Sequence, residues 1–226
     1  MIAPDEPFVA IGDIHGRADL LTQLLAALPD YQIVCVGDYI DRGEQSAQVL
    51  RVLNARPDIV CLSGNHEEML LDFLANPTGS AARWLRFGGL DTLASFGVAC
   101  TSKIHSDQEL VTFCAALKSE MGPDVIEWIG NLPTCWQSGN VAVVHAGADP
   151  AISIAKQTTE SLHWGHRDFA KVRRDDGLWI LHGHTIVAEP CISGARIAID
   201  TGAYATGCLT AAVVTPGKVE FVSVGN

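Results

Sequence analysis

The sequence lacks the features of a membrane-spanning, secreted or nucleic-acid-binding protein. No apolar run approaches the roughly 18 residues that would suggest a membrane span, and the first seven residues carry no basic stretch of the kind that opens a signal peptide. Basic residues are few, with 15 Lys and Arg against 26 Asp and Glu, so the formal net charge is −11. We therefore expect a cytoplasmic protein with no membrane and no nucleic-acid partner.

Signs of cysteine chemistry are also missing. The seven Cys are an odd number, lie scattered along the chain and form no CxxC pair. Several stand in or beside apolar runs, and none has a basic, turn-like context. We interpret them as reduced, mostly buried thiols, which excludes a disulfide framework and a catalytic cysteine.

The chain has no internal repeat and no low-complexity segment, so its length can be compared directly with that of ordinary domains. It has 226 residues, of which 48% are apolar, and α/β folds of roughly 200–250 residues often form one unit. We predict a single domain over residues 1–226.

The first third of the chain alternates between strand and helix patterns. Apolar runs at 8–11, 31–36 and 59–62 each end at a polar motif, and helical spacing follows, for example over 46–54 and 67–74. This order predicts a parallel sheet with helical crossovers. Open α/β sheets bind their ligands at the carboxyl ends of the strands, where these motifs fall.

Residues 76–138 break this alternation. They contain helix-like stretches and no clear strand, and they separate two strands that carry motifs. We interpret the segment as an inserted helical cap over the site; the alternative is an ordinary peripheral part of the core. Short strands then follow, and the close spacing of 196–199, 209–215 and 218–224 predicts antiparallel pairing. Two sheets packed face to face, with helices outside, fit this order.

Five polar motifs dominate the sequence, each directly after an apolar run: GDIHGR at 12–17, GDYIDRG at 37–43, GNHE at 64–67, HAG at 145–147 and GHT at 183–185. Together they supply three Asp, one Asn and four His. This is the ligand set of a two-metal centre with one His left over for proton transfer. Centres of this kind mainly hold and hydrolyse phosphate esters.

The predicted metal ligands are carboxylates, one amide and imidazoles: Asp13, His15, Asp38, Asn65, His145 and His184. Asp13 and His15 stand two apart beyond a strand, so both side chains can reach one ion. Asp38 has two oxygens and can bridge cations about 3.5–4 Å apart. The mixed nitrogen and oxygen set suits Mn²⁺, Fe or Zn²⁺ better than Ca²⁺.

The remaining motif residues predict the catalytic groups. His66 is expected to be the general acid that protonates the leaving oxygen, with Asp41 fixing its tautomer and raising its basicity. Arg42 can bind phosphate oxygens with its planar guanidinium. The nucleophile would be a water or hydroxide activated by both metals.

These motifs, in this order and over residues 10–212, resemble those of the metallophosphoesterase superfamily, and in particular its phosphoprotein phosphatase branch with the small bacterial and phage serine/threonine phosphatases. The resemblance implies a four-layer α/β/β/α sandwich with a small helical cap. It also implies a dinuclear centre that holds two divalent metal ions, with Mn²⁺ expected and Fe or Zn as alternatives.

The resemblance also assigns roles to individual residues. Asp13, His15 and Asp38 resemble the first-metal ligands, and Asp38, Asn65, His145 and His184 resemble the second-metal ligands. The segment 163–167 is similar to the family's Trp-x-x-Arg, so Arg167 would be a second phosphate contact. Ser63 stands where the family usually carries Arg before GNHE, so one positive group for phosphate or substrate is missing.

Three functions follow as hypotheses. The first is a phosphatase that removes phosphate from phosphoserine or phosphothreonine in proteins. The second is the same centre acting on a dinucleoside polyphosphate such as diadenosine tetraphosphate, which Ser63 mildly favours. The third, a binding scaffold with a degenerate site, is disfavoured because every inferred ligand and the His66–Asp41 pair are present.

Overall fold

The computed structural model describes residues 1–100 and 106–225. The strands are β1 Phe8–Ile11, β2 Gln32–Cys35, β3 Ile59–Cys61, β4 Cys135–Ser138, β5 Val141–Val144, β6 Trp179–His182, β7 Cys191–Ser193, β8 Arg196–Ala198, β9 Cys208–Thr215 and β10 Lys218–Gly225. The α-helices are α1 Ala18–Ala27, α2 Ser46–Asn54, α3 Asn65–Ala75, α4 Pro77–Trp84, α5 Leu90–Ser95, α6 Asp107–Met121, α7 Pro123–Gly130, α8 Thr159–Trp164 and α9 Ala203–Thr206. A π-helical turn, η1 Leu85–Gly89, joins α4 to α5, and η2 Ile154–Lys156 is a 3₁₀ turn.

The strands form two mixed five-stranded sheets. The first has the order β10-β9-β1-β2-β3, with β1, β2 and β3 parallel to one another and β9 antiparallel to both of its neighbours, β1 and β10. The second has the order β4-β5-β6-β8-β7, with β5, β6 and β8 parallel and the two edge strands antiparallel to their neighbours. The parallel strands are central in the second sheet and extend to the β3 edge in the first, and in both sheets their carboxyl ends can carry the motif loops.

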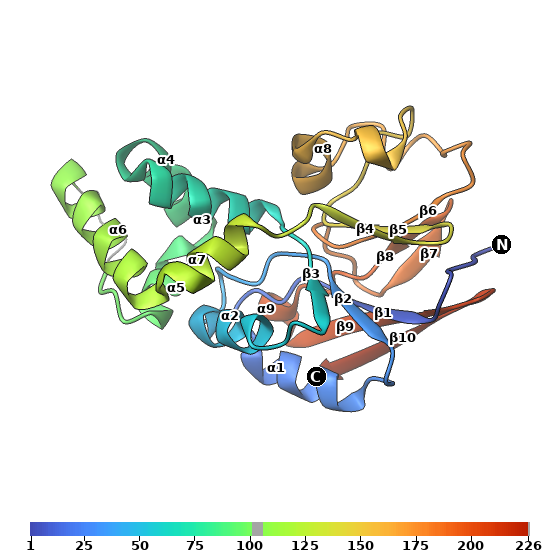
Figure 1. Cartoon of the computed structure of the whole chain (residues 1–226), viewed down its shortest axis with the longest axis horizontal. Helices are drawn as coiled ribbons and strands as arrows, with labels where there is room; N and C mark the ends of the chain where they lie inside the picture. Colours follow the sequence, from blue (N-terminus) through green and yellow to red (C-terminus); the bar gives the residue numbers. More distant parts are fainter. Residues whose placement is uncertain (101–105, 226) are drawn as a thin grey trace.

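The strand sequences explain how the layers pack. On β1, Phe8 and Ala10 belong to the core between the sheets, while Val9 and Ile11 belong to the core shared with the helices. β5 alternates in the same way between the core between the sheets and the core beneath α8. Figure 1 shows α1 and α2 below the first sheet and α8 above the second. The predicted four-layer α/β/β/α arrangement is confirmed.

Three details differ from the sequence predictions. α3 begins at Asn65, so Asn65 and His66 lie on its first turn rather than at a strand end. β8 does not pair with β9, since the chain crosses from the second sheet to the first between these two strands. Instead β8 lies between β6, to which it is parallel, and the unpredicted edge strand β7. β4 falls inside the segment expected to be helical, since Cys135–Ser138 pairs with β5.

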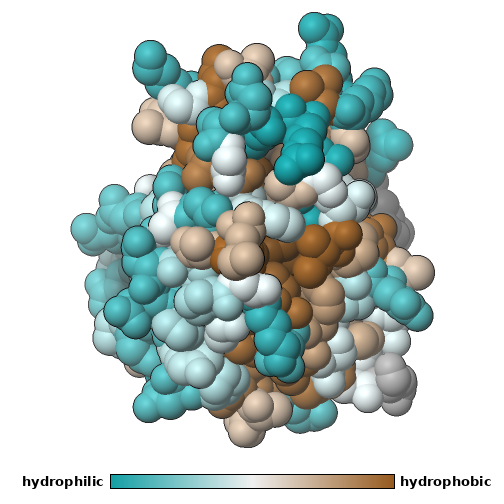
Figure 2. Space-filling model, turned by 90° about the vertical axis from the view of Figure 1, so that its right-hand side faces the viewer, coloured by the Kyte–Doolittle hydropathy of each residue, from teal (hydrophilic) through white to brown (hydrophobic). Residues whose placement is uncertain are grey.

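Helices α3 to α7 lie together to one side of both sheets, at the left of Figure 1. Residues 101–105 of the predicted cap lie outside the described residues. None of the helices in 1–100 and 106–225 combines the length and apolar character needed to cross a membrane. On the side of the molecule that lies at the right in Figure 1, apolar side chains form an irregular patch near the middle of the face, bordered by hydrophilic ones (Figure 2).

Candidate metal centre and catalytic site

Asp38 lies at the centre of the site, on the loop that follows β2. Glu67, on the first turn of α3, holds this loop: its carboxylate accepts the backbone N–H groups of Asp38 and Tyr39 at 2.8 Å and of Gly64 at 2.9 Å. Burial and the nearby charge of Asp38 raise the pKa of Glu67 to about 7. A side chain at position 64 would overlap the Asp38 carboxylate, so the close approach requires glycine.

Left-handed backbone conformations gather in this region. Six described non-glycine residues have positive φ, and five of them are predicted site residues: His15, Asp38, Asp41, Arg42 and His184. Such conformations cost about 1–3 kcal/mol each and persist only where the surrounding structure holds them. Their clustering shows that the motif loops are held in strained conformations, as functional sites often are.

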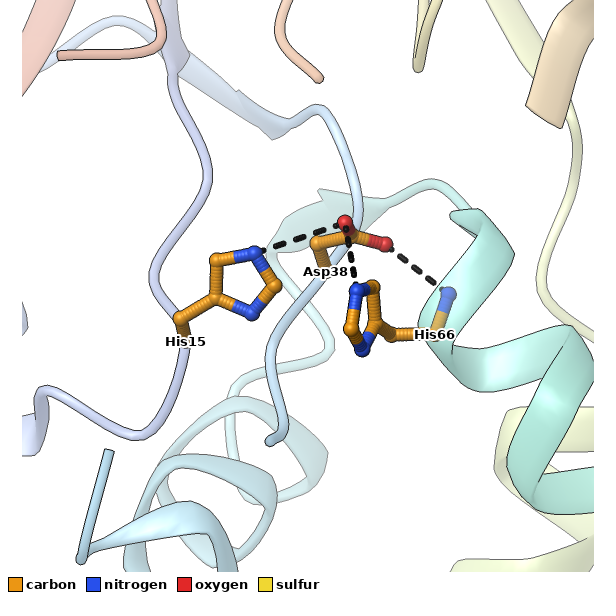
Figure 3. A group of neighbouring side chains, drawn as sticks. All are labelled: His15, Asp38 and His66. Carbon is orange, nitrogen blue, oxygen red and sulfur yellow. Dashed lines mark hydrogen bonds and ion pairs between the residues drawn. The ribbon is translucent and has the colours of Figure 1, made fainter. Parts of the chain in front are cut away.

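The first group of candidate ligands consists of His15, Asp38 and His66 (Figure 3). Nε2 of His15 lies 3.5 Å from Oδ2 of Asp38, and Nε2 of His66 lies 3.8 Å from the same oxygen. The Nδ1–H of His15 donates to the carbonyl of Ile40 at 2.7 Å, which leaves the lone pair on Nε2. Burial lowers the pKa of His15 to about 3, so the imidazole is neutral.

The second group consists of Asp38, His145 and His184, with Asn65 beside them. Nε2 of His145 lies 3.3 Å from Oδ1 of Asp38, 2.9 Å from Oδ1 of Asn65 and 3.2 Å from Nδ1 of His184. Nδ1 of His184 also lies 2.9 Å from Oδ1 of Asn65. His145 donates its Nδ1–H to the carbonyl of Val36 at 3.1 Å. Burial lowers the pKa of His145 to about 3.

These distances test whether the residues fit metal ions. In both groups a neutral imidazole turns a lone pair, not a proton, toward the Asp38 carboxylate. Two donors lie nearby: the backbone N–H of His66 reaches Oδ1 of Asp38 at 3.1 Å, and Nη1 of Arg42 reaches Nε2 of His15 at 3.1 Å. The remaining buried acceptors still face one another, and a cation among them would remove that repulsion. The backbone carbonyls that fix His15 and His145 are the partners that metal-binding histidines usually have. The donor set therefore fits divalent cations that accept both nitrogen and oxygen.

Asp13 belongs to neither group of candidate ligands and instead contacts the backbone of the GHT loop. Its buried carboxylate accepts the backbone N–H of His184, at 3.1 and 3.0 Å to its two oxygens. Burial, with the nearby charge of Asp200, raises its pKa well above its usual value. A side chain at Gly183 would overlap this carboxylate. Asp13 thus links the first sheet to the GHT loop, and its role as a ligand stays a prediction.

His66 and Asp41 form a buried pair. Nδ1 of His66 lies 2.6 Å from Oδ2 of Asp41, and Nε2 of His66 is buried without a hydrogen-bond partner among the described residues. Asp41 also accepts hydrogen bonds from Nε1 of Trp84 at 3.0 Å and from Oγ1 of Thr92 at 2.6 Å. Burial lowers the pKa of His66, but the carboxylates of Asp38 and Asp41 outweigh this and raise it above its usual value.

The two predicted phosphate-binding arginines lie on different sides of the centre. Arg42 donates from Nη1 to Nε2 of His15 at 3.1 Å, and its guanidinium carbon lies 4.8 Å from the centre of the Tyr204 ring. It lines a cavity of about 340 Å³ that also contains Arg17. Arg42 is therefore within reach of a group bound beside His15.

Arg167 is on the rim of a second cavity, of about 280 Å³, which His184 and Trp164 also line. Its side chain is 86% exposed and lies 3.5 Å from a carboxylate oxygen of Asp168. The structure therefore brings Arg167 near His184 but leaves it in solvent.

Sequence reasoning missed the residues that hold the carboxylates. Glu67 stands three positions after Gly64, a capping-box spacing that was a usable signal. Trp84 and Thr92 were not among the predicted site residues. Both reach Asp41 from more than 40 positions away. No local pattern reports such contacts.

Comparisons with known proteins agree with this geometry. Serine/threonine-protein phosphatase 2 of Salmonella typhimurium is 29% identical to this chain, over 88% of this chain and 89% of that protein. An asymmetrical bis(5'-nucleosyl)-tetraphosphatase of Halalkalibacterium halodurans is 28% identical, over 96% and 93%. Serine/threonine-protein phosphatase 2 of Escherichia coli K12 is 43% identical, but over only 35% of this chain and 37% of its own length.

Solved structures show the same fold. The crystal structure of a candidate diadenosine tetraphosphatase has a TM-score of 0.69 at 21% identity, covering 98% of this chain and 95% of that one. A cold-active protein-tyrosine phosphatase of a Shewanella species has a TM-score of 0.60 at 17% identity, covering 98% and 83%. Residues 6–188 match the family described as calcineurin-like phosphoesterase. The chain therefore belongs to the calcineurin-like phosphoesterases, hydrolases of phosphoesters that use divalent metal ions.

Proposed function

We propose that this chain removes phosphate from phosphoserine and phosphothreonine residues of proteins. The observation that carries the proposal is the buried set of acceptors around Asp38, with the free Nε2 of His66 beside it. Such a set suits two cations that hold a phosphate and one acid that releases the leaving oxygen. Similarity to a serine/threonine phosphatase over nearly the whole chain supports a protein substrate.

The ligands would divide between two cations. We assign Asp13, His15 and Asp38 to the first and Asp38, Asn65, His145 and His184 to the second, with Mn²⁺ as the expected ion. When bound, the cations neutralise the charge of the phosphoryl oxygens and lower the pKa of a water molecule. Asp38 is the residue common to both groups, so it would contribute a ligand to each cation.

His66 would supply the proton. Its Nε2 donates to the departing seryl or threonyl oxygen, while Asp41 keeps the proton on Nδ1 and stabilises the imidazolium. The raised pKa keeps His66 protonated to a higher pH than an ordinary histidine, as a general acid requires. Arg42 would bind two phosphoryl oxygens with its planar guanidinium, and Arg167 would add a contact from the rim.

We also propose that α4 to α7 act as the cap of a single domain that spans the chain. The carbonyl of Gly88, in the turn after α4, accepts the backbone N–H of Arg42 at 3.4 Å. Trp84 and Thr92 from the same region bond Asp41. The cap would therefore hold the catalytic pair as well as shape the cleft.

A second candidate function is hydrolysis of a dinucleoside polyphosphate. Two cavities favour it, one of about 340 Å³ beside His15 and one of about 280 Å³ beside His184. Each is lined by an arginine and an aromatic ring, so each suits one end of a substrate with groups on both sides of the phosphate that reacts. A phosphoprotein substrate would not need a cavity on each side of the phosphate.

One experiment separates the two functions. Mn²⁺-loaded protein is given a phosphothreonine peptide or diadenosine tetraphosphate at equal concentration, and the products are identified. Faster release of inorganic phosphate from the peptide is expected. Faster formation of nucleotides from the dinucleotide would replace the first proposal with the second. No turnover of either compound, with metal bound, would contradict both.

A further inference from the structure

A chain of contacts runs beside the metal centre from the loop before α3 to helix α4. Oγ of Ser63 lies 2.8 Å from Nε2 of His163, and Nδ1 of His163 lies 2.6 Å from Oε2 of Glu68. The other oxygen of Glu68 accepts the indole N–H of Trp164 at 3.2 Å. The guanidinium carbon of Arg83 lies 4.2 Å from the centre of the Trp164 ring.

The direction of these hydrogen bonds decides what position 63 can offer. The carboxylate of Glu68 only accepts, so Nδ1 of His163 carries a proton, and Nε2 of the same ring is hydrogen-bonded to the Ser63 hydroxyl. Ser63 is 8% exposed and His163 is buried. The Ser63 hydroxyl is therefore engaged inside the protein. Position 63, where the resemblance leads one to expect a cation, supplies no charge.

Trp164 is held firmly enough to position a partner. Its indole edge is bonded to Glu68, and its ring centroid lies 6.4 Å from that of His184, a candidate metal ligand. The ring also lines the cavity beside His184. One aromatic ring therefore separates a group stacked on Trp164 from the candidate ligand His184.

Arg83 is the group stacked there. It is exposed, and no carboxylate in residues 1–100 or 106–225 forms an ion pair with it. Stacking on an aromatic face orients a guanidinium while its N–H edge stays free to donate to phosphate oxygens in pairs. A cation with this placement and no acidic partner has the properties of an anion-binding group.

We propose that Arg83 binds phosphate oxygens of the substrate and provides from α4 the positive charge that Ser63 lacks. Ser63, His163 and Glu68 bond one another at the loop, Glu68 also holds Trp164, and Arg83 stacks on Trp164. The inference rests on the proposed function only in that the centre binds a phosphoester. It applies equally to a phosphopeptide and to a polyphosphate chain.

Binding of inorganic phosphate tests this inference without turnover. Calorimetric titration of the Mn²⁺-loaded protein is compared for wild type, Arg83→Gln and the matched control Arg86→Gln, which changes a neighbouring exposed arginine. Loss of one charge-assisted contact should weaken phosphate binding about tenfold in Arg83→Gln. Arg86→Gln should leave it unchanged. Equal affinity in wild type and Arg83→Gln would overturn the inference.

Two further variants separate charge from stacking. Arg83→Lys keeps the charge but loses the planar fork, and Trp164→Leu keeps the arginine but loses its support, so both should weaken binding by less than Arg83→Gln. Thermal unfolding checks that each variant folds. With p-nitrophenyl phosphate, Arg83→Gln should raise KM and leave kcat nearly unchanged. A normal KM with a reduced kcat would also contradict the assignment.

The outcome is independent of the substrate proposal. If phosphate binding falls in Arg83→Gln while no phosphopeptide is hydrolysed, the inference stands and the protein-phosphatase proposal fails. If the peptide is hydrolysed while Arg83→Gln binds phosphate normally, the protein-phosphatase proposal stands and the inference about Arg83 fails.

Discussion

The two groups of histidines that meet at Asp38 share one kind of support and differ in another. His15 and His145 each donate to a backbone carbonyl, but only the first group contains a histidine held by a carboxylate, His66. On the side of the first sheet, carboxylates are fixed by side chains from the helical region: Glu67 holds the Asp38 loop, and Trp84 and Thr92 hold Asp41. On the side of the second sheet, His145 is fixed by the backbone carbonyl of Val36. Substitutions of supporting side chains should therefore disturb the first side far more than the second.

The largest effect is expected at the residue that both sides share. Asp38→Asn removes the charge that faces His15, His66 and His145, so both metal ions should be lost together. Metal affinity should fall by more than about 100-fold, beyond what loss of an outer partner costs. Metal analysis after gel filtration measures this. Normal metal stoichiometry in the variant would show that Asp38 does not bridge.

His66→Asn should separate catalysis from metal binding on the first side. Metal content should stay intact, while turnover of an alkyl phosphate falls about 10²- to 10⁴-fold because the leaving alkoxide is no longer protonated. The loss should be smaller for p-nitrophenyl phosphate, whose leaving group needs no proton. Wild-type turnover of the alkyl ester would exclude His66 as the acid.

A pair of histidines tests the second side. His184→Gln should weaken metal binding by at least about 10- to 100-fold, the range that loss of a mere supporting partner of a ligand already costs. His182→Gln is the control, because the His182 ring packs on Phe169 with centroids 5.0 Å apart and its Nδ1 lies 3.0 Å from the carbonyl of Gly183. Metal titrations of both variants measure the difference. Equal losses would mean that the GHT assignment is wrong.

The smallest effect is expected from removing one of the hydrogen bonds that Asp41 accepts. Trp84→Phe keeps most of the buried ring but removes the N–H that lies 3.0 Å from Oδ2 of Asp41. Thr92 remains, so turnover should fall only about tenfold, as loss of one hydrogen bond to a charged group predicts. Trp128→Phe, in the same helical region, should leave turnover unchanged. A similar loss in both variants would indicate a general packing effect.

How much the sequence predicted differs between the fold and the site. The fold class and the family are confirmed, because apolar runs that end at polar motifs mark strand ends in any α/β sheet. The pairing of β8 was predicted wrongly, since a three-residue strand gives no sign of its sheet. The start of α3 was also misplaced, because Asn65 and His66 are weak helix formers, and the helix begins at Asn65 with Glu67 accepting the N–H of the N-cap residue Gly64.

For the site, the sequence predicted the candidate ligands and catalytic groups but not the groups that hydrogen-bond them. The structure places His15, Asp38, Asn65, His66, His145 and His184 within reach of one another. Asp13 and Arg167 lie near them, Asp13 against the GHT loop and Arg167 in solvent. Their roles in metal and phosphate binding remain predictions for the experiments above. The contacts of Trp84, Glu68 and Arg83 had no local signal.

By itself, the sequence determined which polar side chains follow each buried strand, and therefore the family and the class of chemistry. Those features are local, since they depend on neighbours a few positions away. Only the tertiary structure decided which imidazole nitrogen is free, which side chains hold the carboxylates and where an unpaired arginine stands. Val36 and His145 are 109 positions apart, and Ser63 and His163 are 100 apart. Contacts of this kind exist only after the two sheets and the helices have packed together.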